Sequence, residues 1–208
     1  EFMEQIQPDR EVREYMWYVI STVLEKVNRE EKFYIFTGGG RNGKSKLVEL
    51  INNSIGEYGC TLPIALITRK RGESSKATPE IMKLASKRLA ILKEPDTGMG
   101  DNQLNMGIIK DLTGNDKISA RNLHENEQEI KVDATMILMC NVLPDVASTD
   151  DGTWDRLRVI NFPTHFVTNP KAPNEKLIDK TLSNKIKRWS SVFMTMLIEK
   201  YNEYKGRG

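Results

Sequence analysis

The chain has 208 residues, of which 38% are hydrophobic and 29% charged, a composition typical of one globular domain and too short for two full catalytic domains. Its 31 Lys and Arg against 29 Asp and Glu leave a net charge of only +2, so any nucleic-acid binding must come from a local patch. The longest mostly apolar stretch, residues 134–140, is too short to cross a bilayer, and only Cys60 and Cys140 could form a disulfide. We therefore expect a soluble protein of a reducing compartment.

The first predicted element is an amphipathic helix over residues 9–27, in which apolar side chains recur with the spacing of one helical face. Pro8 and Asp9 provide its start signal. Residues 1–3 resemble a remnant of cloning, and we expect them to have no structural role.

A strand–turn–helix unit follows. Residues 33–36 form a short apolar run that leads directly into Gly38, Gly39 and Gly40, and apolar residues at helical spacing then continue to Gly56. This is the unit from which parallel sheets are built.

The middle of the chain alternates further strands and helices. The predicted strands cover residues 62–67, 89–92, 134–140 and 157–162. One predicted helix begins at Thr78 and Pro79, and another runs from Asp101 or Asn102 to Leu112. A polar hairpin has its predicted arms at residues 117–122 and 128–132. The pattern predicts an α/β fold with a mainly parallel central sheet flanked by helices.

The C-terminal part is predicted to be helical. Residues 163–173 contain three prolines and should form a loop without regular structure, whereas residues 175–204 have helical spacing throughout, as one or two helices. The predicted division of the chain is an N-terminal helical segment at residues 1–28, a core at 29–165 and a C-terminal helical segment at 166–208.

Residues 38–45, Gly-Gly-Gly-Arg-Asn-Gly-Lys-Ser, match the phosphate-loop pattern of Gly, four spacers, Gly, Lys and Ser or Thr. Glycines let consecutive N–H groups turn inward around a phosphate, and the following helix directs its positive end at the same anion. Lys44 would bridge the β- and γ-phosphates of ATP, and the Ser45 hydroxyl would hold Mg²⁺. The predicted nucleotide-binding residues are Gly38, Gly39, Gly40, Arg41, Asn42, Gly43, Lys44, Ser45 and Lys46. The alternative, a mere glycine-rich turn, is disfavoured by the strand before the motif and the helix after it.

Two strand ends carry candidate catalytic residues. Hydrolysis needs a carboxylate that orients water and binds Mg²⁺, and Glu94, just past an apolar strand, is the best candidate. Lys93 replaces the usual Asp before it, so metal binding falls on Glu94 alone or is shared with Asp96. Asn141 closes the strand at residues 134–140 and suits a sensor of the γ-phosphate. The alternatives are an exposed strand-end carboxylate and an ordinary turn residue.

The order of phosphate loop, strand-end Glu94, hairpin and strand-end Asn141 resembles superfamily 3 helicases. In detail it is similar to the poxvirus-type primase-helicase family of large DNA viruses and phages. The similar stretches are GGGRNGKS at residues 38–45, LTGNDKISAR at 112–121, CNVLP at 140–144 and WDRLRVINFP at 154–163. The resemblance implies an AAA+-type phosphate-loop core that assembles as a ring, usually a hexamer, with ATP between subunits and single-stranded DNA in the channel. It also implies that residues 1–28 help subunits pack, although they equally suit a helix that covers its own core.

The resemblance assigns further roles. It places an arginine finger on Arg156, with Arg158 close behind; the alternative for Arg156 is a surface ion pair with a neighbouring Asp. It implies that the hairpin projects into the channel and contacts DNA. The candidate DNA-binding residues are Lys117, Arg121, His124 and Lys131. Three glutamates near the hairpin tip depart from this pattern and leave a solvated hairpin as the alternative.

The resulting functional hypothesis is an ATP-driven DNA helicase motor that belongs to a longer viral replication protein. The resemblance implies a primase segment elsewhere in that protein and a cytoplasmic viral replication site. Two alternatives remain open from the sequence. One is a small nucleotide or nucleoside kinase that works as a monomer. The other is a nucleotide-gated DNA-binding scaffold whose hydrolysis is slow because Lys93 occupies the usual acidic position.

Overall fold

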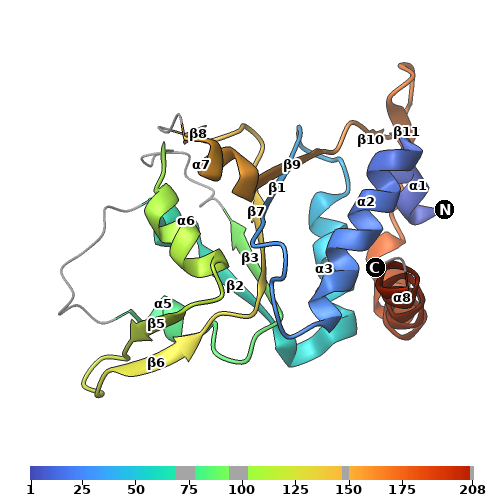
Figure 1. Cartoon of the computed structure of the whole chain (residues 1–208). Helices are drawn as coiled ribbons and strands as arrows, with labels where there is room; N and C mark the ends of the chain where they lie inside the picture. Colours follow the sequence, from blue (N-terminus) through green and yellow to red (C-terminus); the bar gives the residue numbers. More distant parts are fainter. Residues whose placement is uncertain (69–77, 94–102, 147–149, 207–208) are drawn as a thin grey trace.

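A five-stranded sheet forms the centre of the molecule, a computed structural model that describes residues 1–68, 78–93, 103–146 and 150–206 (Figure 1). The sheet order is β2-β3-β7-β1-β9, and every neighbouring pair is parallel. The strands are β1 (Phe33–Thr37), β2 (Gly59–Pro63), β3 (Leu89–Lys93), β7 (Thr135–Met139) and β9 (Leu157–Asn161). This confirms the predicted α/β fold with a parallel central sheet.

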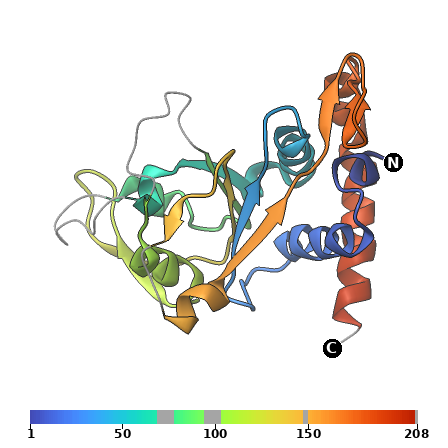
Figure 2. The same cartoon turned by 90° about the horizontal axis from the view of Figure 1, so that it is seen from above.

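Both faces of the sheet are covered, which explains why the three central strands β1, β3 and β7 are nearly continuous apolar runs. Phe33 and Ile35 of β1 point into one hydrophobic cluster, and Tyr34 and Phe36 point into the other. The Tyr34 side is covered by three helices: α2 (Arg10–Ser21), α3 (Lys44–Ile55) and α8 (Leu182–Lys205). The other side is covered by α4 (Ala65–Thr68) and α6 (Met106–Thr113). Figure 2 shows these two layers from above.

Shorter elements complete the fold. The remaining helices are α1 (Phe2–Ile6), α5 (Pro79–Met82), α7 (Asp151–Arg156) and the 3₁₀ turns at Thr22–Leu24 and Gly56–Tyr58. The small strand pairs are β4 (Gln103–Leu104) with β8 (Asp145–Val146), β5 (Lys117–Ala120) with β6 (Gln128–Lys131), and β10 (His165–Val167) with β11 (Glu175–Leu177). Within the described ranges, no helix is both long and apolar enough to span a bilayer.

Several predicted elements are confirmed with shifted ends. Helix α2 begins at Arg10 because the Asp9 carboxylate caps it, accepting a hydrogen bond from Val12 N at 3.0 Å. The hairpin is present, with β5 and β6 antiparallel. Helix α6 begins at Met106 after the capping residue Asn105, and the predicted start at 101 or 102 lies outside the described residues.

The prediction of a strand through residues 62–67 is wrong in its second half. Strand β2 ends at Pro63, where its partner β3 also ends, and α4 follows. Leu66 and Ile67 are apolar because they are buried in the second cluster, so the run reflected burial and not strand structure.

Two predictions about the chain ends are also wrong. Residues 1–3 have a structural role: Phe2 begins α1, Met3 is buried, and the Phe2 ring lies 6.1 Å from that of Trp189. Residues 163–173 include strand β10, which pairs in parallel with β11, so residues 175–177 are not helical. The prolines of this segment lie outside both strands, and α8 is a single helix from Leu182.

Candidate nucleotide-binding site

The glycine-rich loop joins the end of β1 to the start of α3 at the carboxyl edge of the sheet. Gly38 has φ +130° and Gly43 has φ +89°, conformations that L side chains rarely adopt. A Cβ on Gly38 would lie 2.7 Å from Phe162 O, whereas Gly39 and Gly40 have open space around them. The loop is therefore tightly packed at its ends and open in its middle, which leaves room for a ligand.

The N-terminal helix and β10 pack behind this loop. A Cβ on Gly43 would lie only 2.4 Å from Cγ2 of Ile6, the fully buried last residue of α1. Phe166 N of β10 donates to Arg41 O at 2.8 Å, and Arg41 itself has a positive φ of 59°. Elements from both ends of the chain thus fix the backbone of the loop.

The loop also gathers hydrogen-bond donors. Lys44 is only 5% exposed, and its Nζ donates to Gly38 O. Asn42 is 4% exposed; its Oδ1 accepts from Lys44 N at 3.3 Å, whereas its Nδ2 is buried without a hydrogen-bond partner in the described part of the chain. The first-turn N–H groups of α3, including that of Ser45, have no carbonyl partner within the helix. This donor set fits the oxygens of a phosphate at a helix N-terminus.

Strand register places Asn141 at the same edge. Met139, the last residue of β7, is paired with Phe36 of β1 and with Lys93 of β3. Asn141 follows two residues later and is exposed, so it lies beside the start of the loop. Glu94 and Asp96 lie outside the described residues.

The structure also bears on the expected magnesium site. The Ser45 side chain is exposed at the start of α3, where a hydroxyl could join phosphate and water oxygens around the ion. The described residues contain no cluster of three or more His, Cys, Asp or Glu that could hold a metal. Of the predicted Mg²⁺ ligands, Ser45 is the one that lies within the described residues.

One residue at this edge was missed by sequence reasoning. Asn161 ends β9, is paired with Thr37, and places its Oδ1 3.3 Å from the Cβ position of Gly38. The available signal was a polar amide at the carboxyl end of a predicted strand, which Asn141 also offers. The edge thus carries two asparagines, one on each side of β1.

Arg156 lies at the opposite, amino edge of the sheet. It ends α7, and the next residue, Leu157, is paired with Phe33 at the start of β1. The whole length of β1, roughly 15 Å of strand, therefore separates it from the glycine loop. Its Nη2 lies 2.9 Å from Glu31 Oε2, and its Nη1 donates to Thr113 Oγ1 at 3.2 Å. The expected ion pair thus exists, but with Glu31 and not with a neighbouring Asp.

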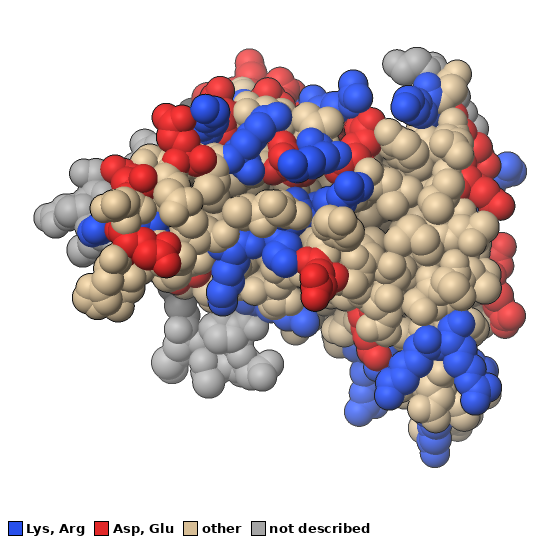
Figure 3. Space-filling view, turned by 90° about the horizontal axis from the view of Figure 1, so that it is seen from below, with Lys and Arg blue, Asp and Glu red and all other residues tan. Residues whose placement is uncertain are grey.

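The β5–β6 hairpin projects away from the sheet (Figure 1). Lys117 Nζ lies 3.1 Å from Glu129 Oε2, and Lys131 Nζ lies 3.2 Å from Asp133 Oδ1. Arg121 N donates to Thr78 Oγ1 at 3.3 Å and Arg121 O accepts from Thr78 N at 2.9 Å, where Thr78 is the residue just before α5. His124 is exposed in the hairpin turn with φ +63°, next to Leu123, which is 69% exposed. Figure 3 shows basic side chains interspersed with acidic ones on this face.

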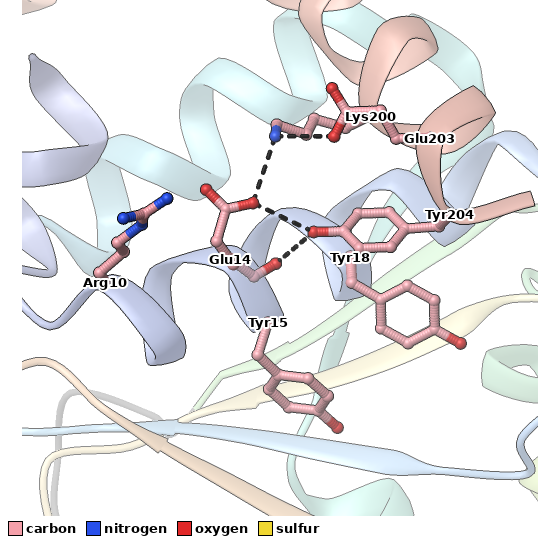
Figure 4. A pocket seen from close by; sticks show the side chains of 7 residues that line it. All are labelled: Arg10, Glu14, Tyr15, Tyr18, Lys200, Glu203 and Tyr204. Atoms are coloured by element: carbon pink, nitrogen blue, oxygen red, sulfur yellow. Dashed lines mark hydrogen bonds and ion pairs between the residues drawn. The ribbon is translucent and has the colours of Figure 1, made fainter. Parts of the chain in front are cut away.

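A cavity of about 610 Å³, away from the glycine loop, lies between α2 and α8 (Figure 4). Lys200 Nζ lies 3.2 Å from Glu14 Oε2 and 2.9 Å from Glu203 Oε2, and the hydrogen bond to Glu203 raises the lysine pKa. The Tyr204 hydroxyl donates to Glu14 O at 2.7 Å, and burial raises the pKa of Tyr18. These groups bind one another, so the cluster joins α2 to α8 and we assign no ligand to it.

The fold and loop define a class: parallel α/β proteins with a glycine-rich strand–loop–helix turn at the carboxyl edge of the sheet. Within that class, the chain belongs to DUF5906, described as a family of unknown function, whose sequence pattern matches residues 36–156. The C-terminal region of NrS-1 has the same fold, with a TM-score of 0.66 over 94% of this chain and 43% of that one. Its sequence identity is 18%, so this likeness concerns the fold alone.

Sequence relatives occur in large DNA viruses. The chain is 37% identical to "Putative helicase L207/L206" of Acanthamoeba polyphaga mimivirus, over all of this chain and 22% of that protein. It is 29% identical to "Putative helicase 022R" of Frog virus 3 over 80% of this chain and 17% of that protein. It is 27% identical to "Putative primase C962R" of African swine fever virus over 83% of this chain and 18% of that protein. The chain spans about a fifth of the length of these relatives, and their names confirm the predicted viral helicase and primase kinship.

Proposed function

We propose that this chain is the nucleotide-hydrolysing part of a viral DNA helicase, which binds ATP between neighbouring copies and moves along single-stranded DNA. The relatives named as helicases and primases support this class. The observation that carries the proposal is that the glycine loop and Arg156 lie at opposite edges of the same sheet, which suits two halves of a site shared between copies. The glycine loop is one half and Arg156 is the other.

The first half binds the triphosphate. Backbone N–H groups of residues 39–45 and the Lys44 ammonium would hold the β- and γ-phosphates, and the exposed Ser45 hydroxyl would be a ligand of Mg²⁺. Magnesium supplies charge neutralisation on the phosphate oxygens when bound. Asn141 donates a hydrogen bond to the γ-phosphate or to the attacking water. Glu94 orients that water and shares the metal with Asp96.

The second half acts on the nucleotide of a neighbouring copy, in a ring that we propose to be a hexamer. Arg156 cannot reach the loop of its own chain, because β1 separates the two. In the neighbour's site the Arg156 guanidinium exchanges the Glu31 carboxylate for the transferring phosphoryl group. An arginine placed in this way raises the rate by a factor on the order of 10³ to 10⁵.

DNA binding is assigned to the β5–β6 hairpin in the channel of the ring, through Lys117, Arg121, His124 and Lys131. Lys117 and Lys131 are paired with acidic residues, so each exchanges a carboxylate for a DNA phosphate. We place the protein at a cytoplasmic site of viral replication, with a primase segment elsewhere in a longer chain.

A second candidate, a nucleotide-gated DNA-binding scaffold, is favoured by one observation. Lys93, the exposed last residue of β3, occupies the strand-end position where a metal-binding acid is usual. A cation there would repel Mg²⁺ and slow hydrolysis without preventing nucleotide binding.

ATPase measurements with and without single-stranded DNA separate these candidates. The protein is assayed across a range of concentrations, and its mass in solution is measured at each one. A motor predicts Mg²⁺-dependent hydrolysis that rises with assembly, is stimulated by DNA, and loses the stimulation as salt increases. Tight binding of ATP and DNA by assembled protein with negligible turnover would support the scaffold instead.

A further inference from the structure

A groove of about 880 Å³ opens directly beside the glycine loop. It lies between α1, α3, α8 and the β10–β11 pair, which Figure 2 shows close together at one end of the molecule. Gly43 and Lys46, at the start of α3, line one end of it. This α1–α8 groove is therefore continuous with the place where the phosphates would be held.

The lining of the groove is mostly apolar, and its five aromatic residues include Phe2 and Trp189. Phe2 and Trp189 are partly exposed, and their ring centroids are 6.1 Å apart with planes tilted by 46°. Such rings offer flat faces on which a nucleobase stacks. Cavities that combine apolar walls with a few polar groups are typical of small-molecule sites.

The groove extends along α3 in the direction that a nucleotide would take. Gly43, Lys46 and Leu50 share one face of the helix and all line the groove. At 1.5 Å per residue, Leu50 lies about 10 Å along the helix axis from Gly43. A ribose and its α-phosphate fill such a separation, which puts the base near Leu50 and Trp189.

Polar contacts fix the wall between the loop and α8. Lys46 Nζ lies 2.7 Å from Glu49 Oε2 and donates to Ser183 Oγ at 2.9 Å, so it ties the first turn of α3 to the first turn of α8. Trp189 follows Ser183 in α8 and lies further along the groove. These contacts of Lys46 fix the distance between the glycine loop and Trp189.

We propose that the α1–α8 groove is the subsite for the nucleoside part of the nucleotide, with a purine base stacked on Trp189 and Phe2. This inference rests on the proposed nucleotide binding at the glycine loop, and it adds the residues that recognise the base. The large π-surface of a purine matches two adjacent aromatic rings better than a pyrimidine does. The groove also gives residues 1–6 a role in ligand binding.

The test compares Mg·ATP with inorganic tripolyphosphate, a probe that has the phosphates without the nucleoside. Calorimetric affinities are measured for the wild-type chain, Trp189→Ala, Phe2→Ala and, as a matched control, Trp154→Ala, whose exposed ring lies on α7 away from the groove. We expect Trp189→Ala to weaken ATP binding by about 10-fold or more and Phe2→Ala to weaken it by less. Tripolyphosphate binding should stay unchanged in both, which also shows that the variants are folded.

A fluorescence measurement that keeps Trp189 and Phe2 in place supports the calorimetry. The chain has three tryptophans, so Trp17→Phe with Trp154→Phe leaves Trp189 as the sole indole reporter. Its emission should change with ATP and remain unchanged with tripolyphosphate. No change with bound ATP would overturn the proposal.

The remaining outcomes separate the groove from the loop. Equal affinity of wild-type protein for ATP and tripolyphosphate, or equal losses for both ligands in Trp189→Ala, would overturn the groove proposal and leave the phosphate site standing. Failure of the wild-type chain to bind either ligand would overturn both. Reduced self-association of Trp189→Ala with unchanged ATP affinity would assign the groove to a second copy of the chain instead.

Discussion

The two edges of the central sheet differ in what they leave available. At the carboxyl edge, the glycine loop has open space above Gly39 and Gly40, and Asn42 has a buried amide nitrogen without a hydrogen-bond partner among the described residues. At the amino edge, the Arg156 guanidinium is bound by Glu31 and Thr113. The carboxyl edge therefore has open space and a hydrogen-bond donor, whereas the amino edge has a guanidinium paired with a partly exposed carboxylate.

This difference follows from the parallel topology. All five strands start at one edge and end at the other, so the residue just before a strand and the residue just after it lie at opposite edges of the sheet. A site that needs both the loop and Arg156 therefore requires two copies in contact. Each of the following predictions tests one side of that contrast.

The largest effect is expected from Arg156→Ala. Turnover of the assembled protein should fall by about 10³-fold or more, because the variant removes charge stabilisation of the transferring phosphoryl group. ATP affinity of a single copy should not change. Arg158→Ala is the matched control; it lies two residues further along the chain, in β9, and the variant should lose far less turnover. The protein is also diluted until its copies are separate. If Arg156→Ala then loses ATP affinity by as large a factor as it loses turnover, Arg156 does not act on the neighbour's nucleotide.

The second effect concerns the carboxyl edge. Lys44→Ala should reduce turnover by about 100-fold, since a buried donor to the phosphate is removed. Lys46→Ala is the matched comparison and should have a smaller effect, because Lys46 Nζ is engaged by Glu49 and Ser183. Steady-state ATPase and ATP-binding assays measure both. Similar losses of turnover and ATP affinity in the two variants would show that Lys44 contributes no more to phosphate binding than Lys46 does.

The third effect is on stability at the same edge. Gly43→Ala should destabilise the fold by about 1–3 kcal/mol, because its φ is +89° and the new Cβ would collide with Ile6. Gly40→Ala is the matched control, with open space at its Cβ position, and should change stability by less than about 1 kcal/mol. Urea unfolding measures the free energy of unfolding of both variants. If both lose the same amount, α1 does not constrain the loop.

The fourth effect tests the amino edge. Glu31→Gln removes the carboxylate that holds Arg156, but the glutamate is partly exposed, so the free energy of unfolding should fall by no more than about 1 kcal/mol. Urea unfolding measures this loss. A much larger loss would mean that Arg156 is needed to hold the fold together and is not available for exchange.

The smallest effect is a pH dependence at the rim of the α1–α8 groove. The hydrogen bond from Lys185, with further bonds from Thr181, lowers the pKa of Asp179 from 3.8 to about 2. A lowered pKa in the folded state stabilises the protein above about pH 4, and the contribution is lost as the pH falls from 4 to 2. Urea unfolding between pH 2 and 5 should show a larger loss in the wild-type chain than in Asp179→Asn, which keeps only the contributions of other carboxylates such as Glu175.

Sequence patterns were sufficient for the elements that form by local rules. The runs at β1, β3 and β7 are apolar because both faces of the sheet are covered, and the glycine loop has the spacing of a known motif. Patterns failed where tertiary contacts decide. Helix α1 has only five residues and is held by its packing against the loop and Trp189.

The candidate site divides in the same way. The loop and Asn141 could be placed from the sequence because each follows an apolar strand. The Glu31 partner of Arg156 and the α1–α8 groove could not, because their residues lie far apart along the chain. Only the fold brings residues 2, 43 and 189 to one cavity.

Complementation between two inactive variants tests the central claim most directly. Lys44→Ala keeps a functional Arg156, and Arg156→Ala keeps a functional loop, so a mixed assembly contains some complete sites between unlike copies. In an equal mixture, roughly a quarter of wild-type ATPase activity should return, since about one contact in four combines the two intact halves. Mixed assemblies, verified by mass, that remain as inactive as either variant alone would contradict a site shared between copies.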